Sequence, residues 1–188
     1  MTMPDPRIHE TLRLLAAYRP APIEAETYQD MVDMLGGTSA PLDRDQFEPG
    51  HFTAGGFVVN SERSDVLMIE HRKLGRWLQP GGHIDIDDSG PEGAARREIE
   101  EETGVGELIP LDEGIFAVDI HAIPAHGDEP AHHHYDVLFA FTTADVTLRP
   151  SAEVAAARWV PLAEAGSLDI DEATLRALIR LRALLARD

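Results

Sequence analysis

The sequence contains no cysteine among its 188 residues. This absence excludes disulfide bonds, zinc sites built from thiolates and a cysteine nucleophile. The chain also lacks any apolar run close to the roughly 18 residues that a transmembrane helix needs. Its first ten residues, MTMPDPRIHE, do not have the charged and apolar segments of a signal peptide. We therefore expect a cytoplasmic protein that does not associate with membranes.

Basic residues are scarce: 16 Lys and Arg stand against 34 Asp and Glu, which gives a formal net charge of −18 at pH 7. This balance argues against general nucleic-acid binding, which needs a basic surface, and against docking on an anionic membrane. An acidic protein can still accept an anionic small molecule if divalent cations lie between the two. Since 43% of the residues are hydrophobic, the chain has enough apolar material for a core.

The order of the expected elements predicts the fold class. Residues 6–35 show helical spacing and precede a loop at 38–50. The remainder alternates short β-rich runs with two helical segments. The expected strands are 53–60, 65–72, 77–84 (broken by glycines), 115–123, 134–143, 146–150 and 157–162. The expected helices are 90–103, which Gly104 should end in a left-handed conformation, and 171–187. We predict an α/β (α+β) sandwich, a mixed sheet flanked by helices. Residues 1–50 would be an N-terminal helical extension, and 51–188 the main domain with its C-terminal helix.

Three carboxylates converge on the predicted helix 90–103. At about 100° per residue, Glu98 and Glu102 lie about 40° apart, and Glu101 lies about 60° to the other side of Glu98. Arg97 precedes Glu101 by four residues and can pair with it. A solvated acidic helix face is the ordinary interpretation of such a run. The alternative is a site for a cation with oxygen ligands, such as Mg²⁺ or Mn²⁺.

The preceding glycine turn favours the cation site. Gly82 followed by REIEEETGV, Arg97–Val105, resembles the Nudix box, and the second half of that motif matches at every specified position. Gly82 and Arg97 enclose 14 residues, one more than the family pattern has. Loops absorb such an insertion more easily than helices. The extra residue therefore affects only the first acidic position of the motif, which we assign to Asp88.

The resemblance implies a Mg²⁺-dependent enzyme that hydrolyses a diphosphate linkage, usually in a nucleoside diphosphate joined to another moiety. The family pattern makes Glu98, Glu101 and Glu102 metal ligands, with the backbone carbonyl of Gly81 as a further ligand. Glu101, Glu102 and Arg97 are then the expected catalytic residues. Mn²⁺ is an alternative cofactor, the partner is a small diphosphate substrate, and a homodimer is compatible with the family.

Further residues are candidates for substrate binding, each with a plainer alternative. Arg72 could meet phosphates or belong to a simple turn, and Trp77 could stack on a base or be a buried aromatic residue. His83 follows the glycine pair. His134 belongs to the run His132–His134 and shares a strand face with Asp136, so we expect these two side chains to pair. Three adjacent histidines on a strand alternate faces and do not easily converge on one ion. We interpret Glu153 as a surface loop residue. The alternative is that it supplies a catalytic carboxylate from outside the helix.

Two other functions compete with hydrolysis. A non-catalytic Nudix-like regulator that binds a nucleotide would not need Glu98, Glu101 and Glu102 together. An isomerase acting on an isoprenoid diphosphate is the other alternative, but the form of that enzyme that resembles this family uses a cysteine, which this chain lacks. The simplest interpretation is a structural domain without catalytic function, in which the acidic helix is merely solvated.

Overall fold

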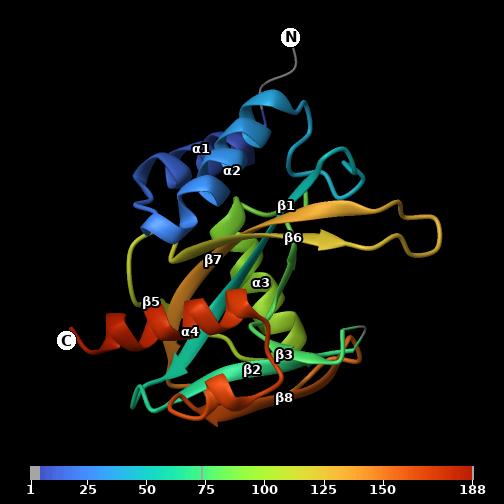
Figure 1. Ribbon diagram of the computed structural model, residues 1–188. Helices are drawn as coiled ribbons and strands as arrows, with labels where there is room; N and C mark the ends of the chain where they lie inside the picture. The colour runs from blue at the N-terminus through green and yellow to red at the C-terminus, as the bar shows by residue number, and fades with distance from the viewer. Residues whose placement is uncertain (1–4, 73, 188) are drawn as a thin grey trace. The chain divides into compact units, whose positions relative to one another are not determined.

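The computed structural model describes residues 5–72 and 74–187 (Figure 1). The chain forms two compact units, each assembled from three segments of the sequence. The first unit comprises Met1–Gly55, Gly82–Ala95 and Gly114–Phe139. The second comprises Gly56–Gly81, Arg96–Glu113 and Ala140–Asp188.

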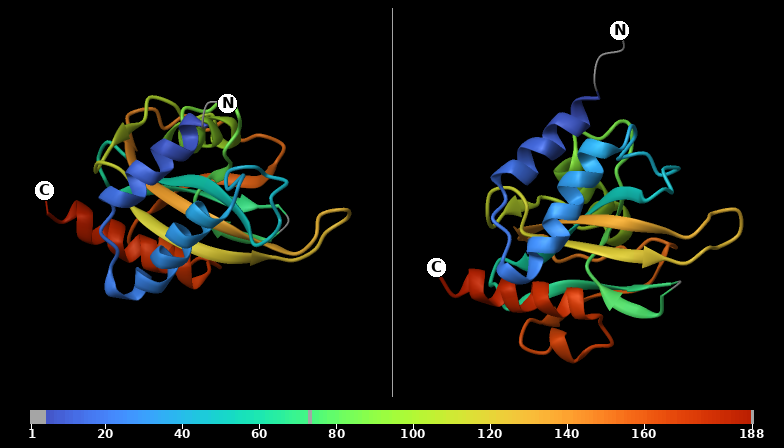
Figure 2. Two further views of the ribbon diagram at one scale, coloured as in Figure 1. Left: turned by 90° about the horizontal axis from the view of Figure 1, so that it is seen from above. Right: turned by 45° about the horizontal axis from the view of Figure 1, so that its top comes forward.

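The first unit begins with two helices, α1 (Pro6–Ala17) and α2 (Ala25–Gly37), joined by a 3-10 turn at Pro22–Glu24. The α1 helix starts where its sequence predicts, because the Asp5 carboxylate accepts the Arg7 backbone N–H at 2.9 Å. Figure 2 shows α1 and α2 side by side. Tyr18 and Tyr28 hold them together, with ring centroids 6.2 Å apart.

The strands of the first unit place its polar side chains. They are the beginning of β1 (Gly50–Asn60), the end of β4 (Gly81–His83), β6 (Ala117–Ile123) and the beginning of β7 (His132–Thr143). Strands β6 and β7 pair antiparallel, with Ile123 opposite His132, His121 opposite His134 and Asp119 opposite Asp136. Because alternate residues of a strand share a face, His132, His134 and Asp136 lie on the same face of β7.

The second unit is built around β2 (Asp65–His71). This strand pairs antiparallel with the end of β1, with β3 (Arg76–Leu78) and with β8 (Val154–Pro161). The short β5 (Ile109–Pro110) pairs with the end of β7. Helix α4 (Glu172–Leu185) begins at Asp171, whose carboxylate accepts the Thr174 N–H at 2.7 Å. The apolar residues of β2, Val66 to Ile69, are fully buried and form the core of this unit.

Helix α3 (Pro91–Thr103) matches the helix predicted at 90–103. Its apolar side is buried at Ala94, Ala95 and Ile99. The helix ends at Gly104, which adopts φ +75 and donates its N–H to the Glu100 carbonyl at 2.8 Å. A left-handed residue at a helix C-terminus favours glycine, so the sequence signal at this position is confirmed.

Across the described residues the strands pair in the order β3-β2-β1-β7-β5, with β4 on β1, β6 on β7 and β8 on β2. This mixed sheet flanked by helices is the predicted fold class. The strand predicted at 146–150 is wrong: the segment has no regular structure, and the N–H of Arg149 bonds instead to the Thr103 carbonyl at 2.7 Å. No helix within 5–72 or 74–187 has the length and apolar character required to cross a membrane.

Candidate functional site

The carboxylates of α3 differ in their exposure. Glu102 is buried, with 7% of its surface exposed, whereas the Glu101 side chain is 59% exposed. The Glu98 side chain lies between them at 14%. The predicted face therefore runs from the buried Glu102 to the solvent-exposed Glu101.

Arg97 holds two of these carboxylates. Its Nη1 donates to Glu101 Oε2 at 2.9 Å, which is the predicted pair, and to Glu98 Oε1 at 2.8 Å, which the helical spacing did not reveal. A planar guanidinium fixes the direction of the oxygens that it contacts. Arg97 thus restrains both carboxylates and offsets part of their mutual repulsion.

Glu102 is held by the glycine turn. The Gly81 N–H donates to Glu102 Oε2 at 3.0 Å, which connects the two parts of the motif through a direct contact. The pKa of Glu102 is raised from 4.5 to about 7: burial is the largest cause, the charges of Glu98, Glu153 and Glu101 act in the same direction, and the Gly81 hydrogen bond opposes them. A buried carboxylate among other carboxylates is electrostatically unfavourable unless a cation accompanies it.

A segment distant in sequence lies against the end of α3. The Ser151 N–H donates to the Glu102 carbonyl at 3.0 Å, and two residues later Glu153 is close enough for its charge to raise the Glu102 pKa. The structure confirms the predicted surface loop position of Glu153, which is exposed in a turn. Its charge nevertheless acts on Glu102 together with those of Glu98 and Glu101.

Arg72 supports this same segment. Its Nε donates to the Ala152 carbonyl at 3.2 Å and its Nη2 to the Val154 carbonyl at 2.9 Å. These two bonds straddle Glu153, so Arg72 fixes the backbone that carries that carboxylate. Its predicted contact with substrate phosphates stays a prediction.

The two remaining candidates near the glycine turn have partners of their own. The guanidinium of Arg158 lies 4.1 Å from the centroid of the Trp77 ring, so one face of the indole is already covered and the stacking of a base on Trp77 stays a prediction. In the first unit, Asp88 accepts the Asp85 backbone N–H at 2.7 Å. The assignment of Asp88 to the first acidic position of the motif likewise stays a prediction.

The residues around Glu102 offer the kind of ligand atom that a hard divalent cation prefers. They offer carboxylate oxygens from one helix and one loop, they repel one another, and the buried member has a raised pKa. Oxygen donors are the ligands preferred by Mg²⁺ and Mn²⁺. A cation bound here would replace the interactions that Glu102 loses by burial.

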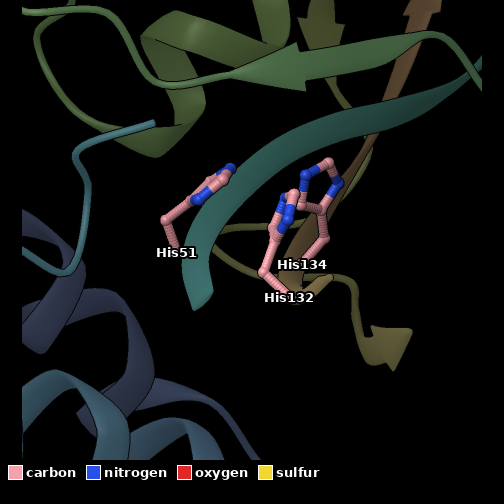
Figure 3. A group of neighbouring side chains, drawn as sticks. All are labelled: His51, His132 and His134. Atoms are coloured by element: carbon pink, nitrogen blue, oxygen red, sulfur yellow. The ribbon is translucent and has the colours of Figure 1, made fainter. Parts of the chain in front are cut away.

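A second group of titratable side chains lies in the first unit. It contains His51 from β1, His83 from β4, and His132 and His134 from β7, shown in part in Figure 3. The His83 and His134 ring centroids are 5.4 Å apart, so the structure brings together these two predicted substrate-binding histidines. Burial lowers the pKa of His83 from 6.5 to about 4 and that of His134 to about 3. Both rings are therefore neutral near pH 7.

The pairing of β6 with β7 explains this group and corrects one expectation. His134 and Asp136 share a face as expected, but the hydrogen-bonded partner of Asp136 is His121, whose Nδ1 lies 2.8 Å from Asp136 Oδ2. The Thr53 hydroxyl also donates to Asp136. His121 reaches this carboxylate from the neighbouring strand, where it lies diagonally opposite Asp136.

Sequence reasoning missed His51 and His121. Neither belongs to a local motif: His121 joins the histidine group through the pairing of β6 with the next strand, β7, and His51 joins it from β1, which is far away in the chain. A cavity of about 410 Å³ also borders His132 and is lined by Phe47, Pro49 and Ile123 among other residues. This cavity gives the histidine group an apolar neighbour within the first unit.

The chain belongs to the Nudix family, since the family model described as NUDIX domain matches residues 49–181. A Bacillus subtilis (strain 168) protein named "Putative 8-oxo-dGTP diphosphatase" is 30% identical over 110 residues, which cover 58% of this chain and 66% of that protein. The match thus spans just under two thirds of the length of that relative.

Solved structures share the fold. A hydrolase of the NUDIX family from Clostridium perfringens is 26% identical, with a TM-score of 0.54, covering 76% of this chain and 99% of its own. The NUDIX domain of Shewanella oneidensis NrtR, solved with ADP ribose, is 19% identical with a TM-score of 0.55, and covers 93% of this chain and 97% of its own. The latter likeness concerns the fold alone.

Proposed function

We propose that this protein is a Mg²⁺-dependent hydrolase that cleaves the diphosphate linkage of a nucleoside diphosphate joined to another moiety. The observation that carries the proposal is the buried Glu102, which accepts the Gly81 N–H and lies within reach of the charges of Glu98, Glu101 and Glu153. A buried carboxylate with several acidic neighbours is a place for a cation. Mn²⁺ is the alternative ion.

The chain's own residues have separate roles in this proposal. Glu98, Glu101 and Glu102 hold the ion, together with the carbonyl of Gly81. When bound, the ion would neutralise phosphate oxygens and increase the acidity of a coordinated water. Arg97 keeps Glu98 and Glu101 oriented through its two hydrogen bonds. Glu101 and Glu102 are the proposed catalytic carboxylates, and Glu102 requires deprotonation before it can act as a ligand.

The substrate class rests on the similarity to a named relative. The Bacillus subtilis relative carries the name of a nucleotide diphosphatase, which favours a nucleotide substrate. The substrate contacts predicted for Arg72, Trp77, His83 and His134 stay predictions. The division into residues 1–50 and 51–188, a homodimeric state and a cytoplasmic location stay predictions.

A nucleotide-binding regulator without catalysis is the second candidate. It explains a Nudix fold, but it does not explain why three carboxylates are retained on one face of α3 and restrained by Arg97. The isomerase alternative has no cysteine to support it.

A substrate screen tests the proposal. The purified chain is incubated with a panel of nucleoside diphosphate derivatives and nucleoside triphosphates, with Mg²⁺ or with EDTA, and the products are separated by ion-exchange chromatography. We expect cleavage of at least one compound with Mg²⁺ and none with EDTA. Tight binding of a nucleotide without turnover of any compound would instead support the regulator.

A further inference from the structure

We propose that His51, His132 and His134 form a binding site for a transition-metal ion of the Zn²⁺ type, separate in chemistry from the carboxylate site on α3. Each of the three side chains offers one ligand nitrogen, and these atoms lie within 4.8 Å of one another. The ring centroid of His51 is 5.1 Å from that of His132 and 4.8 Å from that of His134. Figure 3 shows the His51 ring from β1 near the two rings from β7.

The alternation of side chains along β7 brings two of the three adjacent histidines together on one face. His132 and His134 lie on one face of β7, while the intervening His133 is exposed on the other. The objection that three adjacent histidines cannot share an ion therefore applies to His133 alone. The third ligand is His51, which the neighbouring segment of β1 contributes.

Backbone carbonyls fix the tautomers of two rings. His51 Nδ1 lies 3.1 Å from the Gln46 carbonyl, and His132 Nδ1 lies 2.8 Å from the Pro130 carbonyl. A carbonyl only accepts, so each Nδ1 carries the proton and each Nε2 keeps its lone pair. An imidazole that donates one N–H to a carbonyl and presents its other nitrogen to an ion is the usual arrangement of metal-bound histidines.

His51 provides an independent reason to expect a ligand. The residue is only 1% exposed, and among the residues that the structure describes its Nε2 has no hydrogen-bond partner. Burying an acceptor without a partner is unfavourable. A metal ion would satisfy this lone pair, whereas a stack of neutral rings alone would leave it unsatisfied.

The donor set selects the kind of ion. Neutral imidazole nitrogens suit Zn²⁺ and its neighbours Cu²⁺ and Ni²⁺, while Mg²⁺ prefers oxygen. Three protein nitrogens at about 2.0–2.1 Å from Zn²⁺ lie about 3.4 Å apart in a tetrahedral site and leave a fourth position open. Side-chain rotations that bring the ligand nitrogens together from within 4.8 Å would complete the site. The His121–Asp136 pair lies beside it, with the His121 and His134 ring centroids 5.3 Å apart.

Metal titration of the full chain tests the site. The protein is stripped with chelator, and Zn²⁺ binding is measured by isothermal titration calorimetry in excess Mg²⁺, so that the α3 carboxylates are occupied. We expect one Zn²⁺ per chain, and a dissociation constant that rises at least about 100-fold in His51→Gln and in His132→Gln, beyond the roughly 10–100-fold typical of lost outer-shell partners. His133→Gln, which alters the exposed neighbour, should bind as the wild type does.

Two further readouts keep the test decisive. At a hundredfold excess of Zn²⁺ over its dissociation constant, the unfolding midpoint of the wild type should rise by about 5 °C or more, and that of His132→Gln should not. Co²⁺ substituted for Zn²⁺ should give the intense visible absorption of a tetrahedral site with nitrogen ligands. Equal Zn²⁺ affinity in His51→Gln, His132→Gln and His133→Gln, or a weak octahedral Co²⁺ spectrum, would overturn the proposal. None of these outcomes depends on whether the chain hydrolyses a diphosphate.

Discussion

Glu102→Gln should lower kcat of the Mg²⁺-dependent hydrolysis by about 1,000-fold, since removing a group that only orients a metal ligand already costs about 10–100-fold. The substitution keeps the size of the side chain and its ability to accept the Gly81 N–H. It removes the negative charge that we assign to the ion. Steady-state kinetics on the compound that the wild type cleaves fastest measures the change.

Glu100→Gln is the matched control for this experiment. Glu100 lies on the same helix but is exposed on the opposite face, and its substitution also removes one carboxylate. We expect wild-type kcat and KM. Full turnover by Glu102→Gln, or equal losses in the two variants, would show that the carboxylates of α3 do not hold the catalytic ion.

In the metal-free protein, the contribution of Glu102 to the free energy of unfolding should decrease as the pH rises. Its folded pKa is raised from 4.5 to about 7 by burial, so between these values the native state binds more protons than the unfolded state. Stability from this residue is therefore lost as the pH rises from 4.5 to 7. Relative to Glu102→Gln, the wild type should be less stable by up to about 3 kcal/mol above pH 7.

Urea unfolding of both proteins in EDTA, from pH 4.5 to pH 8, measures this difference. Burial lowers the pKa of His83 and His134, which makes stability rise with pH up to their ordinary pKa of 6.5. Since both proteins contain these histidines, their effect cancels in the comparison. Saturating Mg²⁺ should reverse the sign and make the wild type the more stable protein. A difference that does not vary with pH would contradict the environment assigned to Glu102.

Local sequence signals predicted the part of the site that lies on one element. The spacing of Glu98, Glu101 and Glu102 on a helix follows from its regular period. Gly104 marked the end of that helix. The contact from Gly81 to Glu102 joins two parts of one short motif, so the resemblance to a known pattern was enough to bring them together.

The rest depends on pairing between distant strands and loops. Glu153 belongs with Glu102 only because the backbone of 149–151 bonds to the end of α3 and Arg72 fixes the residues on either side of it. His51 meets His134 only because β1 and β7 bring them together. No local sequence pattern predicts these contacts. The segment 146–150 was misread for the same reason, since its β-like sequence is held by α3 rather than by a strand.

A bound divalent cation would let a protein of net charge −18 accept an anionic substrate. Carboxylates on α3 repel a phosphate when they are bare and attract it when a divalent cation occupies them. The acidic composition and the proposed substrate are therefore compatible only through the metal site.

Binding of Mn²⁺, followed by the loss of the electron paramagnetic resonance signal of the free ion, tests this metal site without any substrate. We predict Mn²⁺ binding that excess Mg²⁺ displaces, weakened about tenfold or more in Glu98→Gln and unchanged in Glu100→Gln. Equal Mn²⁺ affinity in the wild type and in Glu98→Gln would contradict the assignment of the cation to α3.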